Sequence, residues 1–153
     1  MKVCIGGTFD KLHKGHKILL KKAFELAGET GIVFIGLATD DLTRNKKDVK
    51  PLIDRLKILK QYLSKEEIDK QAVIVPITNK YGLTLKEDFD AIVISPETEK
   101  NAMEINKKRV LNGKKPLKII RVDFVLAEDG KPISSTRINN KEIDENGNLL
   151  QRD

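Results

Sequence analysis

The sequence predicts an α/β fold of the Rossmann-like kind: an open, parallel, five-stranded sheet with helices on both faces. Short apolar runs alternate along the chain with longer segments whose apolar residues recur at helical spacing. This alternation is typical of parallel sheets with helical crossovers. The run IVFIGLAT (32–39) is continuously apolar, as a strand buried on both faces is. A glycine pair directly after the first apolar run indicates a tight passage from strand to helix.

Length and composition indicate one globular domain. The chain has 153 residues, of which 39% are apolar and 34% charged, and this balance is that of a globular protein with a substantial core. We expect a single domain over residues 1–153, in which about 144–153 form a polar tail. No apolar run reaches membrane-spanning length and no signal-peptide pattern opens the chain, so we expect a cytoplasmic protein with no membrane partner. For Cys4, inside the first apolar run, we expect a small buried side chain.

The net charge of +6 raises the hypothesis of a nucleic-acid partner. The lysines are spread over the chain, and only two Tyr and five Phe are available to stack on bases. A basic balance equally suits a small substrate with several negative charges. We therefore expect no nucleic-acid partner, and the sequence leaves the oligomeric state open.

The chain opens with a strand, a helix and a second strand. The first strand is expected over Val3–Ile5 and the second over 32–39, while Gly28 to Gly31 end the helix between them. The apolar positions that give this helix its period are Ile18, Leu19, Leu20, Ala23, Phe24 and Ala27. Together these segments predict one βαβ unit.

The middle of the chain predicts a helix and two further strands. The helix is expected from about Pro51, because proline is tolerated in a first turn and leucines follow at helical spacing. SKEE (64–67) has a capping-box pattern, so a short turn is expected to open there. Buried strands are expected over 72–77 and 91–95, separated by a stretch of turn residues.

The last third predicts two helices and the fifth strand. A helix is expected over Thr98–Asn112, with Gly113 at its end. The fifth strand is expected within PLKIIRVDFV (116–125), and a short final helix is expected to start at Ser134.

The stretch GGTFDKLHKGH (6–16) carries the strongest functional signal. Glycines at the strand end let a ligand approach the backbone, and a helix N-terminus offers unpaired N–H groups and a positive dipole end to an anion. His13 and His16, three residues apart, project to one side of that turn. The stretch therefore predicts a polyphosphate site, with Asp10 as a structural hydrogen-bond acceptor. A simple turn with surface histidines is the alternative; a zinc site is disfavoured because a third ligand is missing.

Polar and basic groups follow two other strands. In open α/β sheets ligands bind outside the carboxyl ends of the strands, so groups at these ends face the same crevice as the histidines. The groups concerned are Arg44, Lys46, Lys47 and Lys50 after the second strand, and Ser95 and Glu97 after the fourth. Taken alone, the basic cluster would be interpreted as a solvated loop.

A second motif, ISSTRI (133–138), lies near the other end of the chain. It places three hydroxyls and a guanidinium, Ser134 to Arg137, at the start of a predicted helix. N-capping accounts for one serine. Four such groups in a row fit a triphosphate better.

The two motifs together resemble the signatures of the nucleotidylyltransferase superfamily, T/H-x-G-H first and the serine-rich motif second. Within that superfamily, SPETEKNAMEINKKR (95–109) followed by AEDGKPISSTRI (127–138) resembles the phosphopantetheine adenylyltransferases of archaea. The resemblance covers nearly the whole chain.

This resemblance implies transfer of AMP from ATP to 4'-phosphopantetheine, with Mg²⁺ held mainly by the phosphates and no metal ligands from the chain. The catalytic residues it implies are His13, His16 and Lys46. ATP is expected to contact Gly7, Thr8, Phe9, His13, His16, Ser134, Ser135, Thr136 and Arg137. The acceptor is expected to contact Thr8, Lys46, Lys47, Ser95, Glu97 and Arg109.

Several of these assignments leave alternatives open. Lys46 matches the family's phosphate-binding lysine best by spacing, and Lys47 is its rival. Tyr81 and Gly82 match a pair beside the pantetheine arm, or are loop architecture. The bacterial branch of the family has arginines at the end of the fourth strand; Arg109 could stand in for them or form a surface ion pair. For the whole chain, the alternatives are another cytidylyl- or adenylyltransferase acting on a small phosphate acceptor, or a nucleotide-binding module without turnover.

Overall fold

The computed structural model describes residues 1–151 and contains the expected five-stranded, all-parallel sheet, with the strand order β3-β2-β1-β4-β5. The strands are β1 (Lys2–Gly7), β2 (Ile32–Ala38), β3 (Ala72–Ile77), β4 (Ala91–Ile94) and β5 (Lys118–Arg121). The helices are α1 (Lys14–Ala27), α2 (Asp40–Thr43), α3 (Leu52–Lys65), α4 (Glu99–Leu111) and α5 (Ser135–Asn139), with short 3₁₀ turns η1 (Asp69–Gln71) and η2 (Pro96–Thr98). The predicted fold class is confirmed.

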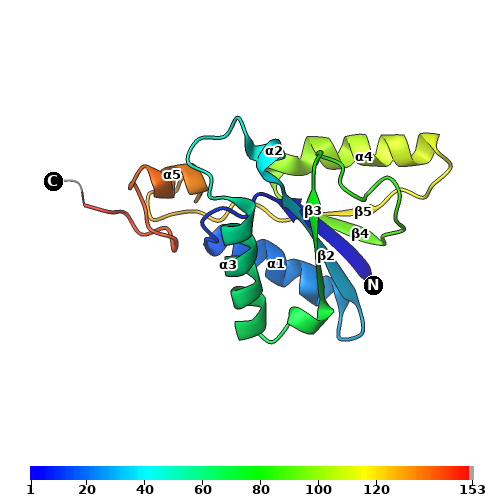
Figure 1. Ribbon diagram of the computed structural model, residues 1–153, viewed down its shortest axis with the longest axis horizontal. Coiled ribbons are helices and arrows are strands. Elements are labelled where there is room, and N and C mark those ends of the chain that lie inside the picture. The colour runs from blue at the N-terminus through cyan, green and yellow to red at the C-terminus, as the bar shows by residue number, and fades with distance from the viewer. Residues whose placement is uncertain (152–153) are drawn as a thin grey trace.

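Helices cover both faces of the sheet (Figure 1). Side chains alternate along a strand, so Val3 and Ile5 face the side of α1 and α3, while Cys4 between them faces the side of α4. Each face has its own apolar cluster, and Leu20 of α1 and Ile105 of α4 are almost fully buried in them. The central strands are therefore buried on both faces, as their continuous apolar runs predict.

The central strands β1 and β4 part after a short pairing. β1 pairs with β2 along its whole length, from Lys2↔Ile32 to Gly7↔Leu37. It pairs with β4 only at Val3↔Ala91 and Cys4↔Ile92. The chain order also reverses between these two strands, and such a switch point is where open α/β sheets bind ligands. The carboxyl ends of β1 and β4 are thus free to line a site.

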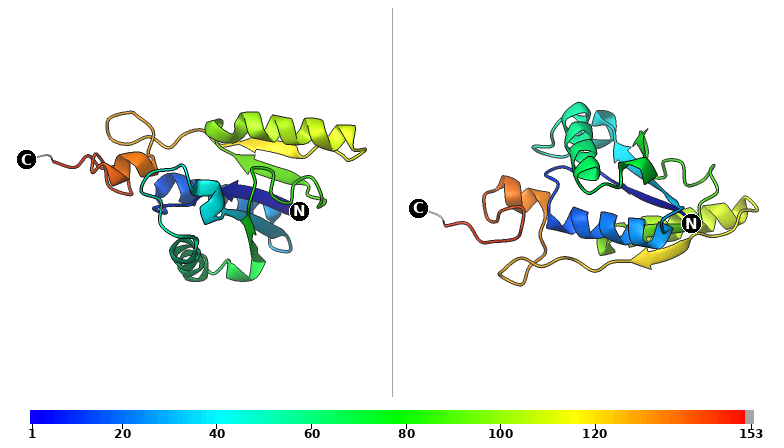
Figure 2. Two further views of the ribbon diagram at one scale, coloured as in Figure 1. Left: turned by 45° about the horizontal axis from the view of Figure 1, so that its top comes forward. Right: turned by 90° about the horizontal axis from the view of Figure 1, so that it is seen from below.

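The last part of the described chain forms a small unit beyond that end of the sheet. α5 and the C-terminal segment lie together there in all three views (Figures 1 and 2). The unit has a separate apolar cluster around Ala127, Ile133 and Ile143, and Ile143 is fully buried. The backbone N–H of Lys14 donates to the carbonyl of Glu145 at 2.9 Å, so the segment following Ile143 is tied to the start of α1.

Some element boundaries differ from the sequence-based expectation. Ser64 of SKEE (64–67) is not a helix cap: α3 continues through Lys65, because Leu63 is buried against the sheet and holds the last turn in place, and the expected turn follows at Glu66 and Glu67. The chain turns at Glu67, which has a positive φ of 59°. β5 is shorter than expected, because past Arg121 the chain leaves the sheet for the C-terminal unit. In the described residues, none of the helices combines the length and apolar character needed to cross a bilayer.

We predict that Ile143→Ala destabilises the C-terminal unit. The substitution removes a side chain with no exposure from the smallest of the apolar clusters, and such a cavity costs about 2–5 kcal/mol. Hydrogen exchange should show earlier loss of protection in Ser135–Asn139 than in the central strands. Leu150→Ala, at a side chain that is 43% exposed, is the control and should leave unfolding within about 0.5 kcal/mol of wild type. Equal effects of the two changes would contradict this prediction.

Candidate active site

A cavity of about 570 Å³ opens where β1 and β4 part, and both sequence motifs line it. The sequence-predicted residues that the structure brings to its wall are Gly7, Thr8, Phe9, His13, His16, Lys46, Lys47, Ser95, Glu97, Ser134, Ser135 and Thr136. The wall also includes Asp48 and Asn139, which the sequence analysis did not single out. Segments from opposite ends of the chain thus converge on one space.

His13 and His16 form a reciprocal cap at the start of α1. The backbone N–H of His16 donates to Nδ1 of His13, and that of His13 donates to Nδ1 of His16, each at 3.3 Å. The two rings stack with their centroids 3.7 Å apart and an angle of 17° between their planes. This is the capping-box arrangement with imidazoles in place of the usual hydroxyl and carboxylate. The same contacts that start the helix therefore orient both rings.

The two imidazoles are neutral at pH 7. Burial lowers the pKa of His13 from its ordinary value of 6.5 to about 4. Burial, together with a smaller effect of the nearby His13 ring, lowers the pKa of His16 to about 3. Because each Nδ1 accepts a backbone N–H, the remaining proton of each neutral ring is on Nε2. Each ring therefore presents a neutral N–H donor.

Two glycines of the first motif make room for the neighbouring rings. A Cβ on Gly15 would lie 2.8 Å from Cε1 of His13, inside the contact distance of real side chains. A Cβ on Gly7 would lie 3.2 Å from the ring of Phe9, which packs against His16 at a centroid distance of 5.3 Å. Phe9 itself has a positive φ of 49°, a strained conformation for an aromatic residue. The glycine between the histidines is thus required by ring packing.

The first turn of α1 offers fewer free amides than the sequence suggests. The N–H of Lys14 donates to Glu145 and that of His16 to His13. Among residues 1–151, the amide of Gly15 has no acceptor, and Gly15 lines the cavity. The anion site of this turn therefore consists of one amide and the two imidazole donors.

A second cavity of about 290 Å³ adjoins the first and is mostly apolar. Its wall comes from the carboxyl ends of the strands, the loop after β3 and the inner face of α4. Thr8 and Lys46 line both cavities, and Nζ of Lys46 lies 2.8 Å from Oγ1 of Thr8. Thr8 and Lys46 therefore lie at the junction of the first and the second cavity.

Tyr81 and Gly82 lie in the wall of the second cavity. The hydroxyl of Tyr81 donates to Glu104 of α4 at 2.5 Å, and Lys80 forms an ion pair with the same carboxylate at 3.1 Å. These contacts fix the loop after β3 against α4. Cys4 lines the same cavity, and burial raises its pKa to about 12, so its thiol stays protonated.

The second motif is joined to the first through Asp10. Ser134 is the N-cap of α5, and its Oγ accepts the N–H of Arg137 at 3.2 Å. Oγ of Ser135 donates to the backbone carbonyl of Asp10 at 2.6 Å. Oδ1 of Asp10 accepts the N–H of Lys50 at 3.2 Å, which confirms the expected structural role of this carboxylate. Asp10 thus links the second motif and the lysine loop to the first motif.

The structure does not place Arg137 at the cavity, in contrast to the sequence-based assignment to ATP. Its guanidinium forms an ion pair with Asp129 at 2.5 Å and donates to the carbonyl of Pro132 at 3.0 Å. Nε also lies 3.6 Å from Glu142. These partners belong to the C-terminal unit, so Arg137 holds that unit together.

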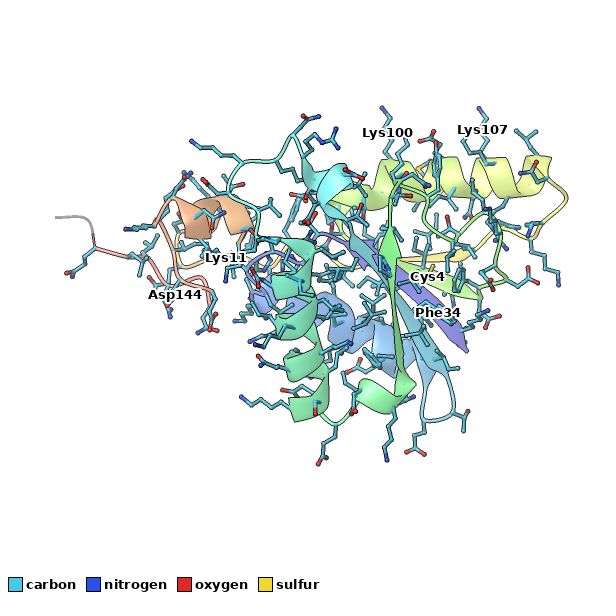
Figure 3. The ribbon with its side chains drawn as sticks, in the orientation of Figure 1. Cys4, Lys11, Phe34, Lys100, Lys107 and Asp144 are labelled. Atoms are coloured by element: carbon cyan, nitrogen blue, oxygen red, sulfur yellow. The ribbon has the colours of Figure 1, made fainter. Side chains whose placement is uncertain are left out.

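Arg109 likewise lies away from the expected place. It is only 2% exposed, and its guanidinium donates to the carbonyls of Lys115, Thr84 and Glu87. Its Nε and Nη1 are occupied by backbone carbonyls, and the residue lines neither cavity of the site, so it is not at the position expected for an acceptor contact and does not form a surface ion pair. Other cations of α4 point away from the sheet, as Lys100 and Lys107 do in Figure 3.

The sequence analysis missed Arg55, a second buried guanidinium. It is 1% exposed and donates to the carbonyls of Thr8 and Lys50, at 2.8 and 2.7 Å. The sequence does contain a signal for this buried arginine. Position 55 falls on the apolar face of α3, four residues before Leu59, and a charged residue on an apolar helix face needs a buried partner.

The carboxylates that line the first cavity are Asp10, Asp48, Glu97 and Asp123. Among residues 1–151, no group of three or more His, Cys, Asp or Glu side chains has an arrangement that could hold a metal ion. A divalent cation in this space would depend on oxygens brought by a ligand.

The chain is similar to known proteins over most of its length. Residues 4–141 match the cytidylyltransferase-like family. A phosphopantetheine adenylyltransferase of Methanosarcina acetivorans is 46% identical over 149 residues, which cover 97% of this chain and 95% of the relative. One of Archaeoglobus fulgidus is 44% identical over 151 residues, covering 98% and 100%. A crystal structure of a protein of unknown function from A. fulgidus has a TM-score of 0.73 at 41% identity, covering 80% of this chain and 90% of that one.

We predict that both imidazoles are uncharged at pH 7, each with a single ring proton on Nε2, and that acid destabilises the fold through both. In the unfolded chain the rings titrate near their ordinary value of 6.5, whereas in the folded chain they titrate at about 4 and about 3. As the pH falls below 6.5 the unfolded state therefore takes up protons first, and the stability present above pH 6.5 is progressively lost until the pH reaches about 3–4.

Nuclear magnetic resonance can follow this directly, because the chain has only two histidines. The ¹⁵N shifts should report the Nε2–H tautomer for both rings, and neither ring should titrate above pH 5. Urea unfolding between pH 6.5 and 5, above the range of ordinary carboxylates, should show the loss of stability. A ring that titrates near 6.5 in the folded protein would contradict the prediction.

Proposed function

The chain belongs to the cytidylyltransferase-like family, and we propose that it is a phosphopantetheine adenylyltransferase, which forms dephospho-CoA and pyrophosphate from ATP and 4'-phosphopantetheine. The relatives that carry this name match nearly the full chain at 44–46% identity. ATP as the nucleotide follows from that activity, and the reaction belongs in the cytoplasm.

One observation carries the proposal: a polar cavity, so named because the polar side chains of both motifs line it, adjoins a smaller, mostly apolar cavity, and the residues common to both walls include Thr8 and Lys46. The histidines and hydroxyls of the polar cavity suit a nucleoside triphosphate. The apolar cavity suits an elongated acceptor such as the pantetheine arm, whose phosphate end would lie at the junction. In this arrangement the acceptor phosphate would lie beside the α-phosphate, as in-line attack requires.

The reaction needs alignment and charge stabilisation rather than a protein nucleophile. A phosphate monoester has a second pKa near ~6 and is mostly dianionic at neutral pH, so its oxygen attacks the α-phosphorus without a strong base. The bond from the α-phosphorus to the bridging oxygen then breaks and pyrophosphate leaves. Negative charge gathers on the five-coordinate phosphorus and the leaving group, where preorganised donors stabilise it.

We assign these donors as follows. Nε2–H of His16 is directed to the α-phosphate, and Nε2–H of His13 with the amide of Gly15 to the phosphate chain. Ser134 and Thr136 offer hydroxyls to the β- and γ-phosphates, and Ser135, whose hydroxyl donates to the carbonyl of Asp10, holds the motif in place beside them. Thr8 and Lys46 hold the acceptor phosphate. Mg²⁺ accompanies ATP and is held mainly by the phosphates.

Acceptor choice follows from the second cavity. Its wall combines β-strand side chains with Tyr81 and the inner face of α4, and this space is larger than a small alcohol phosphate needs. Lys47 lines only the polar cavity, whereas Lys46 lines both, which supports Lys46 as the acceptor ligand.

The decisive experiment incubates the protein with ATP and Mg²⁺ against a panel of phosphorylated acceptors and measures product mass. Dephospho-CoA should form from 4'-phosphopantetheine, with ATP preferred over CTP. Turnover of another small phosphate, or of CTP, would assign the protein to a related transferase. ATP binding without any product would instead indicate a nucleotide-binding module.

We further predict that Lys46→Ala raises the KM for 4'-phosphopantetheine far more than the KM for ATP. The reason is that Nζ of Lys46 lies 2.8 Å from Oγ1 of Thr8 and that Lys46 lines both cavities, whereas Lys47 is in the wall of the first. Removing one charge-assisted hydrogen bond costs about 1.5–3 kcal/mol, which corresponds to roughly a 10- to 100-fold change. Lys47→Ala, next to it in the chain, is the matched control and should change the acceptor KM much less. Equal effects on both substrates would remove Lys46 from the acceptor site.

A further inference from the structure

Arg55 is a buried cation directly behind the junction of the two cavities. Its side chain, from α3, has no exposure to solvent. Nη1 donates to the carbonyl of Thr8 at 2.8 Å, and Nε donates to the carbonyl of Lys50 at 2.7 Å. Nη2 lies 3.4 Å from Oδ1 of Asp40. Arg55 lines neither cavity, so it reaches the site only through the groups it holds.

These contacts close the loop that carries Lys46. At the start of the loop, the N–H of Lys46 donates to the carbonyl of Thr43 at 2.8 Å. At its end, Lys50 is held by Arg55 through its carbonyl and by Asp10 through its N–H. Between these anchors the side chain of Lys46 is exposed and has many rotamers. The loop ends therefore decide where its ammonium group can reach.

Burying the Arg55 guanidinium against two backbone carbonyls lowers the stability of the fold unless these contacts offset the desolvation of its charge. Desolvation of a charge costs several kcal/mol, and the single carboxylate nearby, Asp40, is 65% exposed and 3.4 Å away. Carbonyls of Thr8 and Lys50 come from two loops that share no β-sheet pairing. The planar fork of arginine spans both at once, which a single ammonium cannot do.

We propose that Arg55 is a positioning residue for the transfer reaction: it sets the separation of Thr8 and Lys46 and thereby the place of the acceptor phosphate. The proposal rests on the proposed function, since it names the part of the site that receives the acceptor. Misplacement of a reacting group by about 1 Å can cost on the order of a hundredfold in rate. The effect should therefore appear in the use of the acceptor, with ATP binding preserved.

The molecule contains a matched control in Arg109. Like Arg55 it is buried, lines neither cavity and donates to backbone carbonyls, which here belong to Lys115, Thr84 and Glu87. Thr84 lines the second cavity, but Arg109 holds neither Thr8 nor the Lys46 loop. Arg109→Lys should therefore lower the melting temperature by a similar amount to Arg55→Lys. It should leave kcat close to wild type.

The experiment compares Arg55→Lys, Lys46→Ala and the double variant in the full chain. We expect Arg55→Lys to lower kcat/KM for 4'-phosphopantetheine on the order of a hundredfold, with the Kd of ATP, measured by calorimetry without acceptor, within about threefold of wild type. In the Lys46→Ala background the same change should cost much less, because the group it positions is gone. If the fall in kcat/KM of the double variant equals the product of the falls in the two single variants, the proposal is overturned. It is also overturned if Arg109→Lys lowers kcat/KM as much as Arg55→Lys does.

Two further outcomes are decided by the same series. If Arg55→Lys does not fold, Asp40→Ala releases Nη2 from the exposed side and should lower the same kcat/KM by a smaller factor, again with ATP binding intact; no change in kcat/KM would overturn the proposal. If the wild-type protein uses a different phosphorylated acceptor, the proposed function is wrong. The role of Arg55 is then tested by measuring Arg55→Lys, Lys46→Ala and the double variant with that acceptor. If wild type turns over no acceptor, both fail.

Discussion

The parting of β1 and β4 is the constraint from which the site follows. Two paired residues hold these strands together at their amino ends, and beyond Cys4 and Ile92 the backbone groups that would continue the ladder face open space. The glycines at the end of β1 carry no side chain to fill that space. Helix α1 starts within the same gap, so its first turn, and the rings that cap it, are directed at whatever occupies the opening. A longer β1–β4 pairing would close the cavity.

The site separates charge from hydrogen-bond donation. The donors at the start of α1 and at α5 are neutral: two imidazoles with lowered pKa, the amide of Gly15 and the hydroxyls of Ser134 and Thr136. The positive charge comes from the lysine loop, where Lys46 and Lys47 line the first cavity and Nζ of Lys46 lies 2.8 Å from Oγ1 of Thr8. Neutral, fixed donors bind the ground-state phosphates only moderately, and they gain most where charge develops. The buried arginines serve structure instead, since each donates to backbone or to carboxylates of the chain.

The sequence predicted the sheet, the order of its elements and the two motifs, because apolar periodicity and glycine placement are local signals. It also predicted that the motifs converge, since carboxyl ends of parallel strands share one edge. It could not predict what the arginines bind. The partners of Arg55, Arg109 and Arg137 include backbone carbonyls, which every residue has and no sequence pattern marks. The buried Ile143 was hidden for a similar reason, as a single apolar residue within a polar stretch.

The placement of the second motif depends on interactions that are far apart in sequence. Ser135 donates to Asp10, Asn139 donates to the carbonyl of Asp48 at 3.4 Å, and the amide of Lys14 binds Glu145. α5 has too few residues to be stable alone, and its apolar support is the small cluster around Ile143. The hydroxyls of the motif are therefore held by contacts to the first motif and to the lysine loop rather than by the sheet. Asp10 and the loop that ends at Lys50 thus connect α5, in the wall of the first cavity, to Thr8 and Lys46, which line both cavities.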